Sequence, residues 1–508
     1  MASAPLRDSL PDGPLLREGR NCWRVAQASR AAFLVDGESF FPAVAAALEQ
    51  ARHQVLLLGW DFHGRVRLRR RRRPRPGDEL LGVLGKALDE HPDLHVHALG
   101  WGLGALLALG RERLPRLHFG LHGLPRLDFR LDRSHPWLAC HHQKVIAIDD
   151  RLAFAGGFDV TAYRWDSREH RPDDERRVTP EGEPYGPFHD VQLAVEGDAA
   201  AALGELVRER WRRATGERLA APPPATSPWP PSVPASLTRV QVGIARTEPG
   251  YAGAPAVREV ESLYVDAIAA ARRWIYAENQ YLTSDLVVEC LAARLRERAG
   301  PEVVLVLPAR CPAWLEEASM GRLRARGLAR LRAADRHDRL RLYAPRIAPD
   351  TCVNVHAKVM VIDDALARVG SSNLSNRSLA LDTECDLAVE AGGRADVAAA
   401  IARFRDGLIA EHLGAAEGDV RALVRAEGSL IRAVEKLRGG SRTLEPLDAC
   451  EAPGPVAAAL ASAFDPPGRI ARPGRTAPGA GSSPSRRLGV ALAVLVVALA
   501  LALLLSLG

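Results

Sequence analysis

Two histidine–lysine pairs in matching positions are the residues best suited to chemistry. The chain of 508 residues uses arginine almost throughout, and its four lysines are Lys86, Lys144, Lys358 and Lys436. His142 precedes Lys144 by two residues, and His356 precedes Lys358 by the same spacing. An ammonium group is a compact, rotatable donor to a phosphoryl oxygen, whereas the arginine fork is rigid. An imidazole can attack phosphorus or move a proton. The two pairs therefore indicate phosphoryl chemistry.

The pairs belong to an internal repeat. HHQKVIAIDDRLAFAGGFD (141–159) and VHAKVMVIDDALARVGSSN (355–373) align without a gap. Downstream, HDVQLAVEG (189–197) parallels TECDLAVEA (383–391). In both copies, patterns typical of strands alternate with patterns typical of helices, which predicts an α/β fold. A duplicated fold commonly packs about a pseudo-twofold axis, so we expect each copy to contribute once to any site on that axis.

The expected geometry brings the two pairs together. Alternating β-branched residues predict that each His-x-Lys segment lies in a strand, which places its histidine and lysine on one face. Folding about the axis would then present two histidines and two lysines to one cleft. Small residues after these strands allow close approach to a bound group, and polar ones add neutral donors to phosphate oxygens. They are Gly156, Gly157 and Gly370, followed by Asn373 and by Ser371 or Ser372.

Two facing imidazoles suit a two-step displacement. One attacks phosphorus and forms a covalent phosphohistidine, while the other protonates the leaving oxygen and then activates water or an alcohol. The lysines and Asn373 would stabilise the charge on the non-bridging oxygens. Because cationic side chains supply the positive charge, we expect this reaction to need neither a metal nor a cofactor.

The motif His-x-Lys, four further residues and Asp, present twice, resembles the signature of the phospholipase D superfamily. The resemblance covers most of residues 30–415. Four stretches are similar to phospholipase D proper rather than to the small nucleases: GGFDVTAYRWD (156–166), PFHD with LAVEG and RERW (187–211), IYAENQYL (275–282) and GSSNLSNRS (370–378). The implied fold is two fused phospholipase D-like repeats.

The resemblance also implies the roles of the site residues. His142, in the first motif, would be the nucleophile, and His356 the general acid and base. Each histidine would have a carboxylate partner downstream that fixes its tautomer. Matching the two copies by position assigns Asp190 to the first copy and Glu384 to the second.

Three further carboxylates accompany the motifs. Asp149 and Asp363 complete the two signatures, and we expect them to satisfy the turn after each strand. Asp159 stands where the second copy has Asn373. A carboxylate repels phosphate, so we expect the first half-site to contribute fewer phosphate donors.

The C-terminal residues predict a membrane anchor. Residues 488–508, LGVALAVLVVALALALLLSLG, contain no charge and no proline. As a helix they would span about 30 Å, which matches a hydrocarbon core. Arg486 and Arg487 come directly before this segment, which favours a cytoplasmic body. The seven scattered cysteines form no Cys-x-x-Cys pair, which fits reduced thiols.

Composition shifts divide the chain into six parts. We expect a first repeat at 30–218, a proline-rich linker at 219–238, a second repeat at 239–415, a helical extension at 416–450, a flexible tether at 451–487 and a transmembrane helix at 488–508.

These observations favour an enzyme that acts on membrane phospholipids. It would hydrolyse them to phosphatidic acid or transfer the phosphatidyl group to an alcohol. Cardiolipin synthesis uses the same residues, so the motifs leave it open. A nuclease is supported by the net charge of +6 and the arginine run 69–73, but the anchor and the flanking motifs make nucleic acid the less favoured partner. A non-catalytic scaffold is disfavoured because both half-sites are complete. The headgroup, the acceptor and the oligomeric state stay open.

Overall fold

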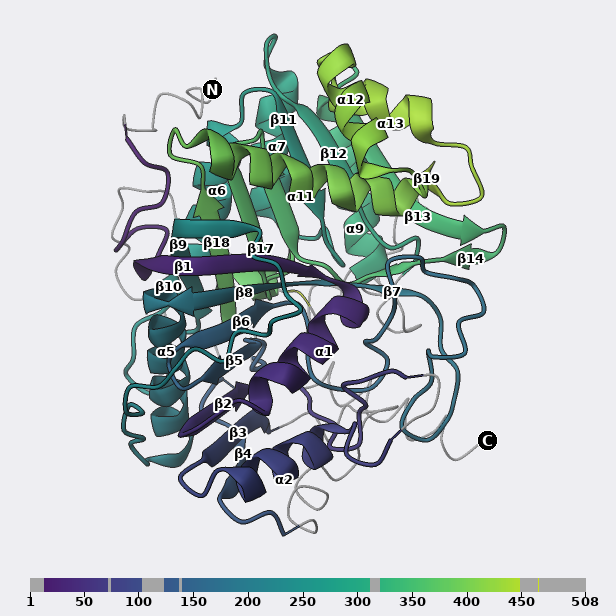
Figure 1. Ribbon diagram of the computed structural model, residues 1–508. Helices are drawn as coiled ribbons and strands as arrows, with labels where there is room; N and C mark the ends of the chain where they lie inside the picture. The colour runs from purple at the N-terminus through teal and green to yellow at the C-terminus, as the bar shows by residue number, and fades with distance from the viewer. Residues whose placement is uncertain are drawn as a thin grey trace, which may run out of the picture.

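The computed structural model describes residues 13–71, 75–102, 123–136, 139–310 and 320–447, together with Asp465. Two mixed β-sheets are joined edge to edge through β1 (Arg24–Val35) and β9 (Leu237–Glu248), which pair antiparallel. Figure 1 shows this junction at the centre of the molecule, with one sheet above it and one below.

The first sheet has the strand order β1-β8-β6-β5-β2-β3-β4. Its other strands are β2 (Gln54–Leu58), β3 (His95–Trp101), β4 (Leu127–Asp132), β5 (Val145–Ile148), β6 (Leu152–Gly156) and β8 (Val191–Gly197). The strands β2, β3 and β4 run parallel, and the remaining neighbours are antiparallel.

The second sheet repeats this order as β9-β18-β17-β16-β11-β12-β13. Its other strands are β11 (Trp274–Glu278), β12 (Glu302–Val306), β13 (Leu340–Ala348), β16 (Val359–Ile362), β17 (Leu366–Gly370) and β18 (Glu384–Glu390). Parallel and antiparallel neighbours also match those of the first sheet position by position. The first strands of the two sheets pair antiparallel with each other, which is the arrangement that a pseudo-twofold axis produces.

Short strands complete the edges and the connection between the sheets. β7 (Phe188–His189) pairs with β15 (Asn354–Val355), β14 (Thr351–Cys352) and β19 (Thr443–Pro446) pair with β13, and β10 (Val257–Arg258) pairs with β9.

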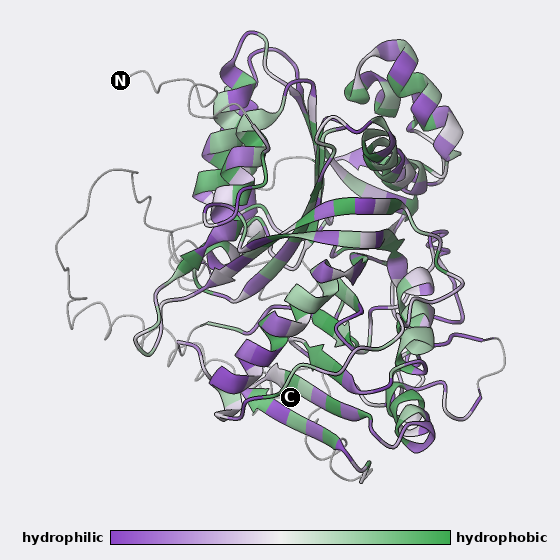
Figure 2. Ribbon diagram, turned by 60° about the vertical axis from the view of Figure 1, so that its left-hand side comes forward, coloured by the Kyte–Doolittle hydropathy of each residue, from purple (hydrophilic) through white to green (hydrophobic). Residues whose placement is uncertain are grey.

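Helices connect and cover the strands. In the first half they are α1 (Asp36–Leu48), α2 (Leu80–Glu90) and α5 (Asp198–Thr215). In the second half they are α6 (Glu259–Ala270), α7 (Asp285–Arg296), α9 (Arg322–Ala334), α10 (Asn376–Ala380), α11 (Ala395–Leu413), α12 (Glu417–Glu427) and α13 (Leu430–Leu437). Figure 2 shows that helices carry both hydrophilic and hydrophobic residues along their length, as amphipathic helices on a core do. The long helices α5 and α11 both end at a glycine in the left-handed conformation, Gly216 and Gly414.

The two halves share one apolar core. A buried cluster contains Val195 and Trp211 from the first half together with Val242 and Ile401 from the second. The strands beside it are buried along their whole length, as in β5, β6, β16 and β17. The two sheets are therefore packed into one unit, which holds residues at their junction in place.

The expected tether and membrane helix, residues 451–508, lie outside the described residues except for Asp465. Among the described helices, none has the length and apolar character needed to cross a bilayer. Residues 219–236, within the expected linker, connect α5 to β9 without forming a helix or strand.

Candidate active site

Each His-x-Lys segment lies just before a strand rather than within it. The strands β5 and β16 begin at Val145 and Val359, immediately after Lys144 and Lys358. The sequence predicted that the strands would include the histidines. They start later because the chain at each histidine pairs with the opposite half of the protein.

Backbone pairing between the two halves occurs at both histidines. The backbone N–H of His356 donates to the carbonyl of His189 at 2.8 Å, directly after β15 pairs with β7. In the same way, the N–H of His142 donates to the carbonyl of Thr383 at 3.1 Å, next to a parallel bridge between His141 and Thr383. Each histidine is therefore aligned with the segment that enters β8 or β18 of the other half.

This pairing between the halves determines which carboxylate each histidine contacts. Nδ1 of His142 lies 2.9 Å from Oε2 of Glu384, and Nδ1 of His356 lies 2.6 Å from Oδ2 of Asp190. The prediction that Asp190 serves the first histidine and Glu384 the second is therefore wrong, since the pairs are crossed. Sequence matching could not reveal this, because it compares the copies without placing them in space.

The crossed contacts orient both rings. A carboxylate that accepts from Nδ1–H fixes the tautomer and leaves Nε2 as the nitrogen available to a substrate. The side chains of His142 and His356 are 14 % and 9 % exposed, whereas Glu384 and Asp190 are fully buried. The rings are thus accessible, and their partners are shielded from water.

The two lysines differ in their surroundings. Lys144 forms an ion pair with Asp159 at 3.3 Å and donates to the carbonyl of His142 at 3.0 Å. Lys358 is fully buried, donates to the carbonyl of His356, and has its Nζ 2.9 Å from Nδ1 of that ring. Within the described parts of the chain, Lys358 makes no ion pair with a carboxylate. Its charge is therefore the less neutralised of the two.

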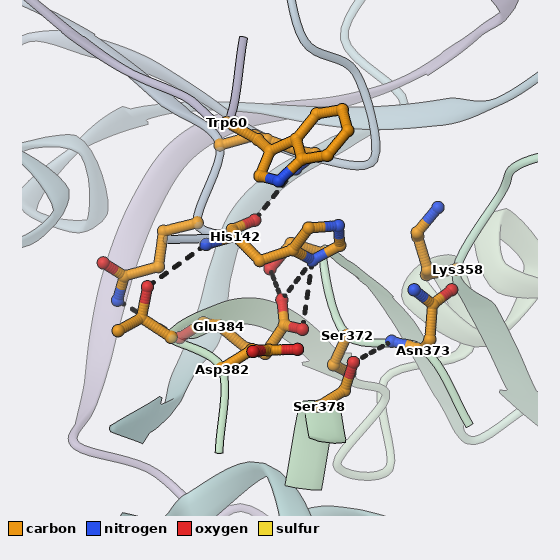
Figure 3. Close-up of polar contacts among 12 residues, drawn as sticks. Trp60, His142, Lys358, Ser372, Asn373, Ser378, Asp382 and Glu384 are labelled. Atoms are coloured by element: carbon orange, nitrogen blue, oxygen red, sulfur yellow. Dashed lines mark hydrogen bonds and ion pairs between the residues drawn. The ribbon is translucent and has the colours of Figure 1, made fainter. Parts of the chain in front are cut away.

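Asn373 lies beside Lys358, as Figure 3 shows. Its side chain is nearly buried, and its Oδ1 has no hydrogen-bond partner among the described residues. The equivalent Asp159 in the first half accepts from the backbone N–H of Trp60 and pairs with Lys144. The neutral amide and the less neutralised lysine thus occur in the same half-site.

The small residues make room for carboxylates. A Cβ on Gly157 would lie 1.9 Å from Oδ1 of Asp190, and one on Gly370 would lie 1.8 Å from Oδ1 of Asp386. A Cβ on Gly156 would lie 2.6 Å from the carbonyl of Val191. The sequence assigned these glycines to the approach of a bound group, but their close neighbours are the protein's own atoms.

Ser371 also serves a carboxylate. Its hydroxyl donates to Oε2 of Glu384 at 2.5 Å and accepts from the N–H of Cys385. The expected role as a phosphate donor does not fit this geometry, because the hydroxyl proton is used by Glu384. The alternative, Ser372, bonds to Asp386 through its hydroxyl at 2.6 Å. Of the small polar residues, only Asn373 keeps the position expected for a phosphate contact.

Asp149 and Asp363 lie at the other end of the short strands β5 and β16. Asp149 accepts from the backbone N–H groups of Arg52, His53 and Gln54, and Asp363 accepts from those of Arg272, Arg273 and Trp274. Each carboxylate therefore caps the start of the neighbouring strand, β2 or β11. This arrangement matches the structural role expected for them.

Burial and neighbouring cations set the protonation of the histidines. Burial, followed by Lys144 and Lys358, holds the pKa of His142 well below its usual range. Burial, followed by Lys358 and Arg164, does the same for the pKa of His356. At neutral pH, His142 is therefore an unprotonated imidazole, which is the form that a nucleophile requires.

Burial also shifts the groups that surround the histidines. It lowers the pKa of Lys358 to about 7, raises that of Asp190 to about 7, and raises that of Glu384. Lys358 favours a bound anion, because a phosphodiester between the lysines would stabilise the charged form of its ammonium group.

Two residues at the site were not assigned from the sequence. Arg164 contributes positive charge to His356, Asp190 and Lys358, and it lies within the stretch 156–166 that carries the resemblance. Trp60 follows β2, and Figure 3 shows its indole next to His142. Only the quoted stretch could have indicated Arg164, and no pattern in the sequence indicated Trp60.

Comparisons with known proteins identify proteins of similar sequence. The family profile "Cardiolipin synthase, PLD-like domain" matches residues 264–405. Phospholipase D zeta 1 of Arabidopsis thaliana is 24 % identical over 48 % of this chain and 24 % of its own length. Cardiolipin synthase A of Pseudomonas entomophila is 24 % identical over 70 % of this chain and 64 % of its own length. The chain therefore spans less than two thirds of these curated relatives.

The fold is also similar to that of a solved structure. Phosphatidylserine synthase of Haemophilus influenzae aligns with a TM-score of 0.54 and 12 % identity, over 82 % of this chain and 97 % of that protein. At this identity the likeness concerns the fold alone. The chain is thus similar in sequence to phospholipase D and cardiolipin synthase proteins, and similar in fold to phosphatidylserine synthase.

Proposed function

We propose that this protein is a phosphodiesterase that transfers the phosphatidyl group of membrane phospholipids through a phosphohistidine. The observation that carries the proposal is the crossed pair of histidine–carboxylate contacts beside two buried lysines. A purely structural pair of histidines would need neither accessible Nε2 atoms nor a buried lysine, Lys358, that forms no ion pair with a carboxylate among the described residues.

In the first step, Nε2 of His142 attacks phosphorus. The bond between phosphorus and the headgroup oxygen breaks. His356, which takes up a proton once the anionic phosphodiester offsets the nearby lysines, gives the proton on its Nε2 to that oxygen. Glu384 stabilises the charge that develops on His142, because it accepts from Nδ1–H of the same ring. Lys144, Lys358 and the amide of Asn373 stabilise the non-bridging oxygens.

In the second step, His356 removes a proton from water or an alcohol. The resulting oxygen attacks phosphorus, the phosphorus–nitrogen bond breaks, and His142 returns to its neutral form. Asp190 stabilises the imidazolium of His356 in this half of the cycle. The products are phosphatidic acid with water, or a new phosphodiester with an alcohol.

Cardiolipin synthesis is a second candidate, supported by the description of the matching family profile and by the Pseudomonas relative. In that reaction phosphatidylglycerol would be both donor and acceptor. The residues named above would perform it without change, because only the acceptor alcohol differs.

We further propose that residues 488–508 anchor the protein in a membrane, with the catalytic repeats at 30–218 and 239–415 in the cytoplasm. The support is the uncharged run after Arg486 and Arg487. Deleting 486–508 should move the protein from the membrane fraction to the supernatant, while full-length protein that stays in the supernatant would contradict the anchor.

The activity can be tested with purified protein in mixed micelles. Phosphatidylcholine, phosphatidylethanolamine and phosphatidylglycerol are each incubated with and without ethanol or glycerol, and the lipids are separated by chromatography and mass spectrometry. Phosphatidic acid or phosphatidylethanol is expected from a phospholipase, and cardiolipin from phosphatidylglycerol alone indicates the synthase. His142→Ala should abolish every product, whereas His337→Ala, at an exposed histidine, should not. Absence of product from all three lipids would contradict the proposal.

A further inference from the structure

A closed cluster of histidines and carboxylates lies directly behind Asp190. Asp36 is the first residue of α1, His170 lies between β6 and β7, His189 is in β7, and Glu411 is near the end of α11. All four side chains are buried. Figure 1 shows β7 beside the junction of β1 and α1. The cluster therefore combines residues from both halves, outside the contacts assigned to catalysis above.

One atom from each of the four residues faces a common point. Nδ1 of His189 lies 2.8 Å from Oε1 of Glu411 and 2.9 Å from Oδ1 of Asp36. Nε2 of His170 lies 3.1 Å from the same Glu411 oxygen and 3.6 Å from Oδ2 of Asp36. The ligand atoms of these residues are all within 4.8 Å of one another. Ligands about 2.0–2.2 Å from a tetrahedral zinc ion would be about 3.4 Å apart, which is close to these spacings.

The outer nitrogen of each ring is bonded to a further carboxylate. Nδ1 of His170 lies 2.9 Å from Oδ2 of Asp166, and Nε2 of His189 lies 2.7 Å from Oε2 of Glu278. Metal-binding histidines commonly donate their other N–H to a carboxylate, which fixes the tautomer and raises the basicity of the ligand nitrogen. Both histidines of this cluster meet that condition.

Hydrogen bonds among these four residues do not satisfy every polar atom that faces the common point. Nδ1 of His189 faces oxygens of both Asp36 and Glu411, and one N–H cannot be well aligned to two acceptors. Oδ2 of Asp36 is buried and has no hydrogen-bond partner among the described residues. A cation at the common point would satisfy the inner oxygens and both inner nitrogens together.

We propose that Asp36, His170, His189 and Glu411 bind a divalent transition-metal ion, with zinc the best fit to two nitrogen and two oxygen ligands. The ion would link the two halves and support β7, which precedes Asp190. The protein supplies four ligands and the residues are buried, so the site has no position for a substrate. Its role would be structural, and the proposed catalytic steps do not involve it.

The competing occupant of the cluster is a pair of protons. If both imidazoles carried two protons, each ring could donate to carboxylates from both of its nitrogens. The total positive charge in the cluster would then equal that of a divalent ion bound by two neutral rings. Neighbouring carboxylates do favour protonation, since Asp36, Asp166 and Glu411 outweigh burial and raise the pKa of His170 to about 9. The two occupants differ in metal content, which can be measured directly.

The test is elemental analysis of the purified full-length protein by inductively coupled plasma mass spectrometry, after gel filtration in buffer with a weak chelator. The expected result is about one equivalent of zinc or another divalent metal per chain, released to a chromogenic chelator only when guanidinium unfolds the protein. Asp36→Asn and Glu411→Gln should each lose most of this metal. His97→Gln, which changes a histidine packed on Trp211 away from the cluster, should retain it.

A second measurement covers variants that fail to fold. Wild-type protein produced with cobalt should show the visible absorption of a tetrahedral ion and no near-ultraviolet thiolate band, because the proposed ligands contain no sulfur. A thiolate band would place the metal at cysteines and overturn the proposal. Wild-type protein without stoichiometric metal, both as isolated and after refolding with zinc, would also overturn it and leave protons as the occupants.

Discussion

Nδ1 of His356 lies 2.6 Å from Oδ2 of Asp190, a carboxylate of the opposite half of the chain, and Glu384 serves His142 in the same crossed way. The cause is the backbone pairing just before each histidine. For His356, the preceding strand β15 pairs with β7, which directly precedes Asp190. A change in one half is therefore expected to affect the histidine of the other.

The crossed contacts predict which chemical step each carboxylate supports. Asp190→Asn should weaken the acid–base function of His356, and Glu384→Gln should weaken the attack by His142. Each change should lower turnover by roughly 10²–10⁴-fold, since the carboxylate orients the ring and stabilises its charged form. Rapid-quench measurement with a nitrophenyl phosphodiester separates them: Asp190→Asn should form the phosphohistidine and then stall, whereas Glu384→Gln should form it slowly. The opposite pattern would support pairing within each half.

The two histidines themselves should fail at different steps. His142→Ala should remove both the covalent intermediate and turnover. His356→Ala should still form the intermediate from a substrate with a good leaving group, because that group departs without a proton. Acid quench and peptide mass spectrometry should find the adduct on the peptide that contains His142. An adduct on His356 alone would reverse the two roles.

Activity should decrease as the pH rises through about 7. Burial and Lys144 lower the pKa of Lys358 to about 7, so this lysine is charged below that pH and loses its charge above it. Binding of the phosphodiester to the free enzyme should weaken accordingly, so kcat/KM should fall on the alkaline side of its pH profile, which gives an alkaline limb. The limb in kcat should lie at higher pH, because the bound phosphate favours the charged lysine. Lys358→Arg should remove the limb at reduced activity, and Lys86→Arg is the control at an exposed lysine. A limb that persists in Lys358→Arg has another origin.

Gly157 should be intolerant of any side chain. A Cβ there would lie 1.9 Å from Oδ1 of Asp190, so Gly157→Ala must displace the carboxylate that orients His356. We expect destabilisation of about 1–3 kcal/mol, typical of overpacking, together with a loss of turnover. Gly186→Ala, at a glycine with nothing within 4 Å of the new Cβ, is the matched control for both measurements. Equal denaturation midpoints and equal rates for the two variants would contradict the steric argument.

Sequence patterns were sufficient to predict the strands and helices, but not how these elements are placed relative to one another in space. Apolar alternation and the repeat predicted an α/β fold, and the matching strand orders of the two sheets agree with two copies of one plan. A structural role for Asp149 and Asp363 was expected from the turn after each strand, but their carboxylates accept from N–H groups at the start of the neighbouring strands β2 and β11. The crossed carboxylates were not expected, since they depend on pairing between segments more than 160 residues apart. The assignment of Ser371 to phosphate failed for a more local reason. Its actual acceptor, Glu384, becomes a neighbour only through the pairing of β17 with β18.

The crossed arrangement also makes unequal half-sites possible. A symmetric homodimer of one repeat would have the same residue on both sides of its axis, so any change at the site would occur twice. A single chain that carries both repeats can alter one side alone. Gly157 opposite Ser371 and Asp159 opposite Asn373 are differences of this kind. Either repeat produced by itself would contain an imidazole without its carboxylate, and it would have to borrow that group from a second copy. Gene fusion thus permits a division of labour between attack and proton transfer that identical subunits cannot encode.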